Sequence, residues 1–444
     1  MKRSRIMPKF MLGITLIVMA LTTPLRAEIV IQEVTSPGGI KAWLVEEHGI
    51  PFTALEIRFQ GGTSLDAAGK RGAVNLMTAL IEEGAGALDS QGFAAARDAL
   101  AAQYSFRSDI DGVSVSAQFL TENRDAATAL LHDALIKPRF DQDAVDRVRG
   151  QVEANLRASE KDPGTIAENI ARARTFGAHP YGSSGDGTLQ SVAGLTRDDM
   201  IAAHKAALAR DRITVSAAGD ISAADLGVLL DKLLGDLPAK GAPLPARADM
   251  VIKGGVSVAP FPGPQSVVLF GHGGMRFDDP DFIAASIIND ILGGGRFTAR
   301  LMTEVREKRG LTYGIGTGLS TSDHSEALMG QFSASNENVA EAMDVIRAEW
   351  AKIATEGVTE AELSSAKTYM TGAYPLRFDG NGTIASILVG MQIMGLPTTY
   401  PATRNARVEA VTMQDIKRVA ARLLKPDDLY FVVVGEPVGL KSTE

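Results

Sequence analysis

The chain repeats one long pattern, and this internal duplication limits its possible folds more than any other feature. Two segments alternate apolar and polar residues and end in glycines, ALEIRFQGG (Ala54–Gly62) and SVVLFGHGG (Ser266–Gly274), about 210 positions apart. Three further pairs follow in the same order at a nearly constant offset: VSAQFLTEN with LMGQFSASNEN, VAGLTRDDMIAAH with VEAVTMQDIKRVA, and ITVSAAGDIS with YFVVVGEPV. Solenoid repeats have periods of about 20–50 residues, so this repeat indicates a duplicated domain. Two unrelated domains with similar patterns are the alternative.

Each copy carries the same order of expected elements. A strand leads into a helix, which we expect over Gly69–Glu83 in the first copy and Asp281–Leu292 in the second. The segments Tyr104–Leu120 and Thr312–Ser335 then alternate with period two, as half-buried antiparallel strands do.

Helical segments come next in each copy. Thr196 and Thr412 each stand three residues before an aspartate, which is a helix-start signal. Antiparallel strand pairs mixed with runs of helices predict an α+β protein built from two homologous α/β-sandwich domains, rather than a doubly wound sheet.

The first 27 residues predict a secretory signal peptide. A basic start without acidic residues precedes the apolar run FMLGITLIVMALTTP, and the small residue Ala27 provides a cleavage site. A membrane anchor is the alternative, but a spanning helix needs about 20 apolar residues. We therefore expect an exported, periplasmic protein cleaved near Ala27, with no stable membrane insertion afterwards.

A stretch rich in Pro, Gly and Ala, LPAKGAPLPARADMVIKGG (Leu237–Gly255), separates the two copies and is typical of a semi-rigid linker. The predicted domain boundaries follow from it. They are an N-terminal domain over residues 28–237, a linker over 238–255 and a C-terminal domain over 256–444.

Composition excludes several classes of site. The chain has no cysteine, which rules out disulfides, thiolate metal sites and a cysteine nucleophile. The formal charge of −8 becomes −13 without the five basic residues of the signal peptide. An acidic surface argues against nucleic acid and against anionic membranes as partners.

Together with the duplication, the turn GGTSLD, the segment VREKRGLTYGI (Val305–Ile315) and the LP pairs at the domain ends resemble the pitrilysin/insulinase family of zinc peptidases. That family includes the mitochondrial processing peptidase, and the resemblance spans residues 30–438. It implies two processing-peptidase-like domains that form a clamshell around a substrate.

Active members of the family bind zinc through an inverted His-x-x-Glu-His motif on the first helix. These positions share one helix face, so two imidazoles meet the metal while the carboxylate handles the attacking water. In GAVNLMTALIEEG the same positions hold Asn75, Thr78 and Ala79. Alanine has no donor atom, and asparagine and threonine are weak neutral zinc ligands. We expect this helix to keep its apolar packing face without its reactive groups.

The family's third ligand, a glutamate on a later helix, falls near QVEANL, where either Glu153 or Asn155 could stand. One carboxylate does not hold a catalytic zinc that normally has three protein ligands. We therefore expect no metal and no other cofactor in this chain. No two histidines have the spacing of metal ligands on one helix face. We interpret the histidines in strand ends and loops as ordinary surface or turn residues. The six histidines are His48, His132, His179, His204, His272 and His324.

The second copy retains the groups that resemble functional ones. Arg306 and Tyr313 match an arginine–tyrosine pair that, in active members, reaches toward the zinc site and holds substrate. A guanidinium offers forked donors to an oxyanion, and a tyrosine hydroxyl can donate to one. The alternative is that neither residue has a functional role: Arg306 would belong to a charged, solvent-exposed helix end, and Tyr313 would be an ordinary strand residue. Glycines 293–295 lack a following Gly-Lys-Ser/Thr, so we interpret them as a helix-end turn rather than a phosphate loop.

Three functional hypotheses follow. The first is a non-catalytic subunit of a heterodimeric zinc peptidase, which pairs with a zinc-bearing paralogue, helps enclose an unfolded peptide and supplies Arg306 and Tyr313 to the partner's site. The second is a stand-alone peptide-binding or scaffold protein without peptidase activity. The third is a self-sufficient metallopeptidase with another metal arrangement.

Overall fold

The computed structural model describes residues 29–248 and 250–443. The expected signal peptide, residues 1–27, lies outside the described residues. Residues Ile31–Glu444 form one compact unit, and the account below concerns its described part. Among the described residues, no helix combines the length and the apolar composition that a membrane crossing requires.

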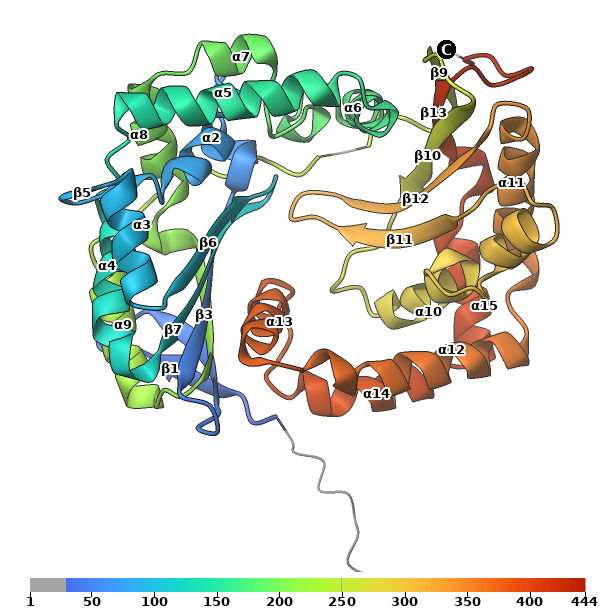
Figure 1. The fold of residues 1–444 in the computed structure, drawn as a ribbon. Coiled ribbons are helices and arrows are strands. Elements are labelled where there is room, and N and C mark those ends of the chain that lie inside the picture. Colours follow the sequence, from blue (N-terminus) through green and yellow to red (C-terminus); the bar gives the residue numbers. More distant parts are fainter. Residues whose placement is uncertain (1–28, 249, 444) are drawn as a thin grey trace, which may run out of the picture. The chain divides into compact units, whose positions relative to one another are not determined.

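Two large β-sheets, one in each half of the chain, organise the described residues (Figure 1). The first has the strand order β1-β2-β8-β3-β7-β6, and the second has the order β11-β12-β10-β13-β9. The strands of the first sheet are β1 (Gln32–Thr35), β2 (Lys41–Glu46), β3 (Phe52–Gln60), β6 (Gln103–Ser108), β7 (Gly112–Leu120) and β8 (Ile213–Gly219). Those of the second are β9 (Gly255–Pro260), β10 (Gln265–Gly273), β11 (Ile315–Thr321), β12 (Glu326–Ser335) and β13 (Tyr430–Gly435). A small separate sheet pairs β4 (Gly84–Ala85) with β5 (Leu88–Asp89).

The two large sheets repeat one topology, which confirms the predicted pair of homologous α/β domains. The order β6-β7-β3-β8-β2 in the first sheet corresponds to β11-β12-β10-β13-β9 in the second. The central strands β3 and β10 are antiparallel to both neighbours. The pairs β2 with β8 and β9 with β13 are parallel. The same mixture of pairings in the same order is what a duplicated domain produces.

Helices connect the strands of each half. In the first half they are α2 (Ala73–Leu80), α3 (Ser90–Ala99), α4 (Arg124–Ile136), α5 (Gln142–Ser159), α6 (Pro163–Phe176), α7 (Leu189–Ala193), α8 (Arg197–Ala207) and α9 (Ala223–Leu234). In the second half they are α10 (Phe282–Gly293), α11 (Val339–Glu356), α12 (Glu360–Ala373), α13 (Asn381–Ile393), α14 (Tyr400–Ala410) and α15 (Met413–Leu423). The predicted capping signals are confirmed, because Thr196 begins α8 and Thr412 begins α15 with reciprocal capping bonds.

Each half has its own apolar core. Ile57 and Phe59 of β3 pack with Leu76 of α2 in the first core, and all three are fully buried. Phe431 of β13 and Trp350 of α11 are fully buried in the second. A chain of this length exceeds what a single core usually organises, and each half accordingly has a core of its own.

The first helix of the first copy is shorter than the predicted Gly69–Glu83. In the structure α2 runs only from Ala73 to Leu80. Gly72, at its start, has a φ of 95°, a left-handed conformation that glycine adopts readily and that ends a right-handed helix. The second-copy prediction, Asp281–Leu292, agrees with α10 to within one residue at each end.

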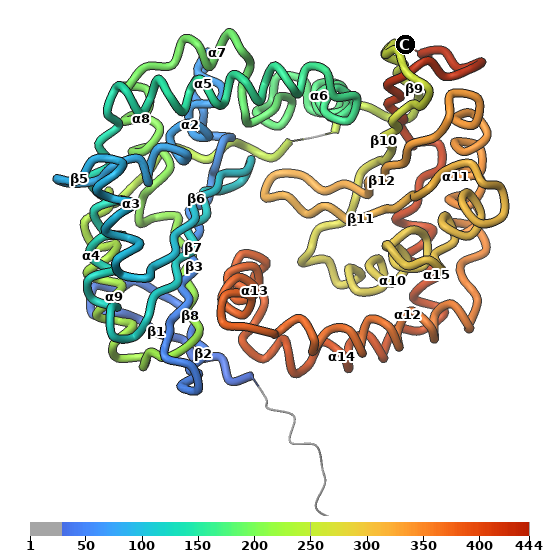
Figure 2. Tube along the Cα trace, in the orientation of Figure 1, coloured from blue at the N-terminus to red at the C-terminus, as the bar shows by residue number. Residues whose placement is uncertain are grey.

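Each half also lends one helix to the sheet of the other. α6 contacts β10 and β13, and α13 contacts β3 and β8, as Figure 2 shows for α13 beside the strands of the first sheet. Ser216 Oγ donates to the carbonyl of Ala385 at 2.5 Å, and Gln392 Nε2 donates to the carbonyl of Val215 at 2.9 Å. Because α13 covers a second face of β8 and α6 covers a second face of β13, nearly all residues of these two strands are buried.

The tip of the β11–β12 hairpin forms a further contact between the halves. Asp323 N donates to Asp111 Oδ2, and His324 N donates to Tyr181 Oη, both at 3.1 Å. Gln60 Nε2 donates to Asp323 Oδ2 at 2.7 Å. Tyr181 Oη in turn donates to Asp111 Oδ1. Because these groups are mostly buried, the contact is a packed polar cluster rather than a surface ion pair.

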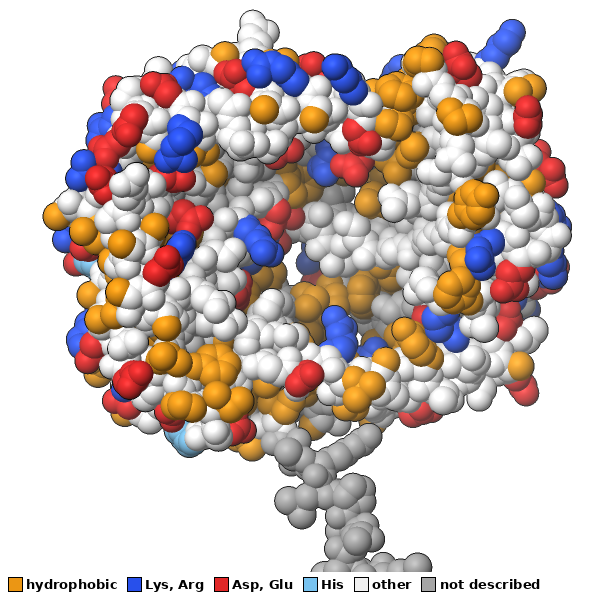
Figure 3. All heavy atoms as spheres, in the orientation of Figure 1, with side chains coloured by type: hydrophobic (Ala, Val, Ile, Leu, Met, Phe, Trp, Pro, Cys, Tyr) orange, Lys and Arg blue, Asp and Glu red, His pale blue; other side chains and the backbone are white. Residues whose placement is uncertain are grey.

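Charged side chains of both signs are mixed over the surface that Figure 3 shows. On that face Lys and Arg alternate with Asp and Glu rather than gather over one element. A face of this kind lacks the single-sign electrostatic footprint by which proteins attract polyanions.

Candidate functional site

The start of α2, where the family motif would lie, is fixed by a buried carboxylate. Asp66 Oδ2 accepts the N–H of Gly72 and Oδ1 accepts the N–H of Val74, each at 2.8 Å. These bonds satisfy donors that a helix start otherwise leaves unpaired. Burial raises the pKa of Asp66, and the hydrogen bonds from Val74 and Gly72 oppose that rise.

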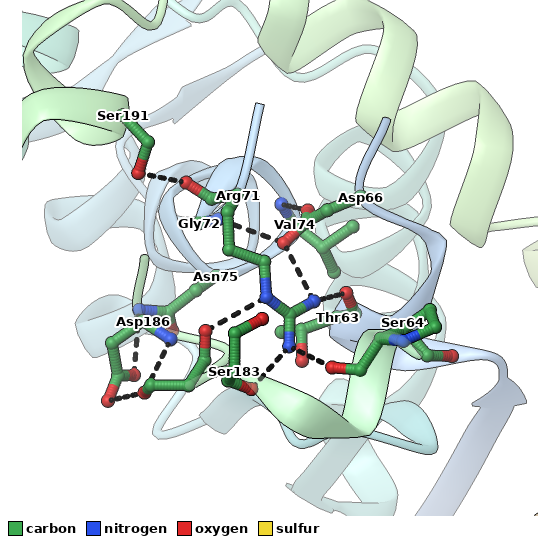
Figure 4. A network of polar contacts seen from close by, with 12 residues as sticks. Thr63, Ser64, Asp66, Arg71, Gly72, Val74, Asn75, Ser183, Asp186 and Ser191 are labelled. Atoms are coloured by element: carbon green, nitrogen blue, oxygen red, sulfur yellow. Dashed lines mark hydrogen bonds and ion pairs between the residues drawn. The ribbon is translucent and has the colours of Figure 1, made fainter. Parts of the chain in front are cut away.

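Arg71 ties this helix start to the loop over residues 180–187 (Figure 4). Its guanidinium donates to the carbonyls of Ser184, Pro180 and Ser183 at 2.9 Å each, and also to the carbonyl of Thr63. Burial lowers the pKa of Arg71, and its ion pair with Asp66 opposes that effect. Four carbonyl acceptors around one forked cation make the loop and the helix a single local unit.

The three motif positions are engaged in protein contacts or lack a donor. Asn75 Nδ2 donates to Asp186 Oδ1 at 3.2 Å (Figure 4). Its Oδ1 accepts from Ser108 Oγ at 3.3 Å. Thr78 is buried and donates to the carbonyl of Val74 at 2.7 Å. Ala79 is exposed. The predicted packing face is confirmed, because the apolar residues of this segment are almost fully buried: Val74, Leu76, Met77, Leu80 and Ile81.

The candidate third position lies on α5, which packs against α2. Glu153 accepts from Arg157 at 2.9 Å, and Asn155 accepts from Gln151 at 3.1 Å. Within the described residues, no group of three or more His, Asp or Glu side chains is arranged to hold a metal ion. The helix pair therefore keeps the family's spacing without a donor set for zinc.

One histidine interpretation is wrong. His272 lies inside β10 and is only 3 % exposed, whereas the sequence suggested a surface or turn residue. Its Nε2 accepts the indole N–H of Trp350 at 2.8 Å. His48, by contrast, is exposed and pairs with Asp220 at 2.7 Å. The period-two pattern around His272 does not reveal that α11 covers this strand with a tryptophan.

Arg306 and Tyr313 lie in the second half. Arg306 is part of a π-helical turn, Met302–Glu307, and its guanidinium carbon is 5.2 Å from the centre of the Phe297 ring. Tyr313 is 89 % exposed. Across residues 29–248 and 250–443, no hydrogen bond or ion pair engages either side chain. Within the described chain, no hydrogen bond or ion pair joins either side chain to α2, so α2 and the Arg306–Tyr313 segment are two separate candidate sites.

The sequence did not indicate three features of these places. The only sequence signal of the Asp66–Arg71 pair is weak: an aspartate stands six residues before Gly72, the glycine at the start of α2. The acceptor Asp186 lies in a distant loop, and its contact with Asn75 depends on how that loop folds back. Phe297 follows the glycines of 293–295, and nothing in its spacing predicts a contact with Arg306.

Comparison with known proteins places both halves of the chain in one family. Residues 42–188 match the family model described as insulinase (peptidase family M16), and residues 194–370 match the model described as peptidase M16 inactive domain. The crystal structure of a peptidase M16 inactive domain from Pseudomonas fluorescens has a TM-score of 0.86 and 28 % identity to this chain. The match covers 93 % of this chain and 99 % of that one.

Curated relatives match over most of their length. A non-peptidase homolog, YmxG, from Helicobacter pylori is 26 % identical over 398 residues, covering 88 % of this chain and 90 % of that protein. An uncharacterized zinc protease from Mycobacterium leprae is 25 % identical over 421 residues, covering 92 % of each. A probable mitochondrial-processing peptidase subunit beta from Schizosaccharomyces pombe is 24 % identical over 331 residues, covering 71 % of each. The chain belongs to the M16 (insulinase) peptidase family.

Proposed function

We propose that this chain is the non-catalytic, substrate-binding subunit of a heterodimeric zinc peptidase that works in the periplasm. Zinc and the general base come from a paralogous subunit with an intact inverted motif. This chain contributes Arg306 and Tyr313 to the bound peptide. The relative named a non-peptidase homolog supports the non-catalytic part of the proposal.

The observation that carries the proposal is the contrast between the two candidate places. At α2 the former motif positions are occupied by internal bonds, such as the one from Asn75 to Asp186. At the second place, the hydroxyl of Tyr313 and the guanidinium of Arg306 have no polar partner within the described chain. The exposed Tyr313 hydroxyl and the half-buried Arg306 guanidinium are therefore available to a carbonyl or an oxyanion of a substrate.

In this scheme each donor has a distinct task. The forked guanidinium of Arg306 binds a peptide carbonyl or carboxylate in two directions at once, which fixes the chain's orientation. Tyr313 donates its hydroxyl proton in a hydrogen bond to the oxygen on which charge develops when water attacks. Neither residue removes a proton from that water, so the hydrolytic step depends on the partner.

The test is to express the chain with the zinc-bearing paralogue of the same genome and to assay peptide cleavage by each chain alone and by both. We expect turnover only for the mixture, with zinc in the paralogue. Arg306→Ala and Tyr313→Phe should each lower kcat by about tenfold to a hundredfold, since a lost oxyanion donor typically costs that much or more. Co-elution of the two chains on size exclusion should persist.

Lys308→Ala is the matched control, because Lys308 lies on the same segment and pairs only locally with Glu304. It should leave turnover unchanged. Unaltered cleavage after both Arg306→Ala and Tyr313→Phe would refute the assignment of these residues. Proteolysis by the purified lone chain with bound zinc would refute the non-catalytic role. Peptide binding without any cleaving partner would favour the stand-alone scaffold.

A further inference from the structure

Arg306 has a fixed backbone and a side chain that no polar group fixes. Its π-helical turn is closed by the N–H of Lys308, which donates to the carbonyl of Thr303 at 3.0 Å. The N–H of Gly310 donates to the carbonyl of Arg306 at 2.9 Å. The guanidinium, by contrast, has no hydrogen bond or ion pair in the part of the chain that the structure describes. Rare π-helical turns occur frequently at functional sites, so the orientation of this side chain matters.

The ring of Phe297 is the neighbour that restrains this guanidinium. The guanidinium carbon of Arg306 lies 5.2 Å from the centre of the ring. At this range a cation is attracted to the face of an aromatic ring. A guanidinium stacks through its planar face, whereas its five N–H groups point outward in that plane. Contact with a ring therefore leaves the forked donors free for a substrate, whereas an ion pair with a carboxylate would occupy them.

The loop that carries Phe297 is itself anchored to two helices. The preceding residue, Arg296, forms a 2.5 Å ion pair with Asp290 of α10, which is only 7 % exposed. Arg296 also contacts α12, because its Nη1 donates to Ser365 Oγ at 3.3 Å. Adjacent residues of one loop thus have different roles. Arg296 fixes the loop to the helices, and the ring of Phe297, which is 65 % exposed, meets Arg306.

Two glycines let this loop turn tightly at the end of α10. A Cβ on Gly294 would lie 2.5 Å from the Cα of Asp290, so no larger residue fits there without a shift of the backbone. Gly295 has a φ of 87°, a left-handed conformation that glycine adopts readily. The glycines therefore bring Arg296 close to Asp290, and the position of Phe297 follows from that contact.

We propose that Phe297 is a positioning residue, which holds the guanidinium of Arg306 in one orientation for a peptide carbonyl or carboxylate. The task for which the guanidinium is held rests on the proposed function. The restraint itself rests on the contact between the two side chains. An arginine without a partner samples many rotamers and loses that freedom when it binds a ligand. A ring that restrains the side chain before the peptide arrives reduces this loss.

The first measurement needs neither a partner nor a substrate. Proton–nitrogen correlation NMR of the full chain on its own detects the Nε–H groups of arginines, and the signal that is lost in Arg306→Lys belongs to Arg306. In Phe297→Leu we expect this signal to move, because the ring current is gone, and its heteronuclear NOE to fall, because the side chain is more mobile. In Phe297→Trp the side chain should remain restrained. An unchanged signal in Phe297→Leu overturns the proposal.

The second measurement uses the two-subunit peptidase of the proposed function. Phe297→Leu should lower kcat by about twofold to fivefold, the factor that a cation–π contact at an exposed site is worth, with little change in KM. Phe297→Trp should restore kcat, because tryptophan offers the best face to a cation. In the Arg306→Ala background, Phe297→Leu should have no further effect, since the ring acts only through Arg306. A full additional loss in that double variant overturns the positioning role.

Tyr400→Leu is the matched control, because the Tyr400 ring centre lies 5.7 Å from the guanidinium carbon of Arg407 on α14. This variant removes a comparable contact elsewhere in the second half and should change neither the Arg306 signal nor kcat. A response of that signal as large as the one to Phe297→Leu would mean that it reports general loosening, and would count against the proposal.

The two measurements also separate this proposal from the proposed function. An Arg306 signal that responds to Phe297→Leu, together with turnover that is unchanged in Arg306→Ala, would refute the proposed function and leave the restraint standing. Turnover that falls in Arg306→Ala, together with a signal that ignores Phe297→Leu, would support the proposed function and refute the restraint.

Discussion

At the scale of single residues, buried polar side chains form hydrogen bonds that join neighbouring elements within the apolar cores. In the second core, His272 joins β10 to Trp350 of α11. Its Nδ1 lies 2.7 Å from the carbonyl of Gly273, so the ring donates from Nδ1 and accepts at Nε2 as a neutral imidazole. Burial lowers the pKa of His272. The link therefore exists only while the ring is uncharged.

Acid should weaken this link at a pH where carboxylates remain ionised. The folded-state pKa of His272 lies below the unfolded value of about 6.5, so the unfolded state binds protons more readily as pH falls. Its stabilisation is complete above about pH 6.5 and is lost below it. Between pH 7 and pH 5 the free energy of unfolding should therefore fall through this residue.

His272→Gln keeps an acceptor for Trp350 but cannot become protonated. Urea denaturation followed by tryptophan fluorescence at pH 7 and pH 5 should show a shallower loss of stability for this variant than for the wild type. Identical losses in the two proteins would show that His272 does not carry the pH dependence.

At the scale of elements, the first helix shows how an apolar core and a polar network together fix the position of one segment. α2 is held from one side by apolar packing of Leu76 and Met77 and from its start by Asp66. Arg71 adds the loop over residues 180–187 to the same unit. The resulting position of α2 depends on the polar network as much as on the core.

Replacing Arg71 should loosen the loop before it affects the rest of the fold. Lysine retains the charge but lacks the planar fork, so it cannot reach carbonyls on several sides at once. Arg71→Lys should lower the free energy of unfolding by about 2 kcal/mol, since more than one buried carbonyl loses its donor. Hydrogen exchange should rise over residues 180–187 and remain unchanged over α13.

Arg210→Lys is the control for this change, because Arg210 is exposed. It should shift stability by less than about 0.5 kcal/mol, as surface substitutions usually do. Equal exchange of the loop in Arg71→Lys and in the wild type would mean that the loop is held by contacts other than the guanidinium.

At the scale of the whole molecule, the two copies of the domain are joined by more than their linker. Each half contributes a helix to the other's sheet, and the β11–β12 hairpin enters a polar cluster built around Tyr181 and Asp111. Burial raises the pKa of Asp111, and the hydrogen bond from Tyr181 opposes that rise. Opening the cluster would break several buried hydrogen bonds together, which makes it costly.

Removing one hydroxyl should loosen the contact between the halves. Tyr181→Phe leaves Asp111 Oδ1 and the N–H of His324 without that partner, and we expect a loss of about 1–3 kcal/mol. Limited proteolysis should then cut faster within residues 238–254, the segment that joins the two halves.

Tyr104→Phe is the matched control, because the hydroxyl of Tyr104 bonds the carbonyl of Ala127 within the first half at 2.7 Å. It should lower stability by about 1 kcal/mol without faster cleavage of the joining segment. Equal cleavage in both variants would show that the Tyr181 cluster does not hold the halves together.

The fold was largely predictable because its signals are periodic and repeated. The alternation in Ala54–Gly62 and in Ser266–Gly274 recurs in the central strands β3 and β10, and Thr196 and Thr412 begin helices as predicted. The bounds of α2 were less predictable, because the apolar pattern continues past its end to Ile81. The left-handed Gly72 sets where the helix starts, and β4 begins four residues after its end.

The sequence by itself determined that the domain is duplicated and that Asn75, Thr78 and Ala79 carry no imidazole, thiolate or carboxylate, because donor atoms are a property of residue type. Only the tertiary structure decided what those positions bind instead, and that α13 packs on the first sheet. Asn75 meets Asp186, and Ser216 meets Ala385, through contacts between residues more than a hundred positions apart. Such contacts depend on how whole elements pack, which local patterns of polarity do not encode.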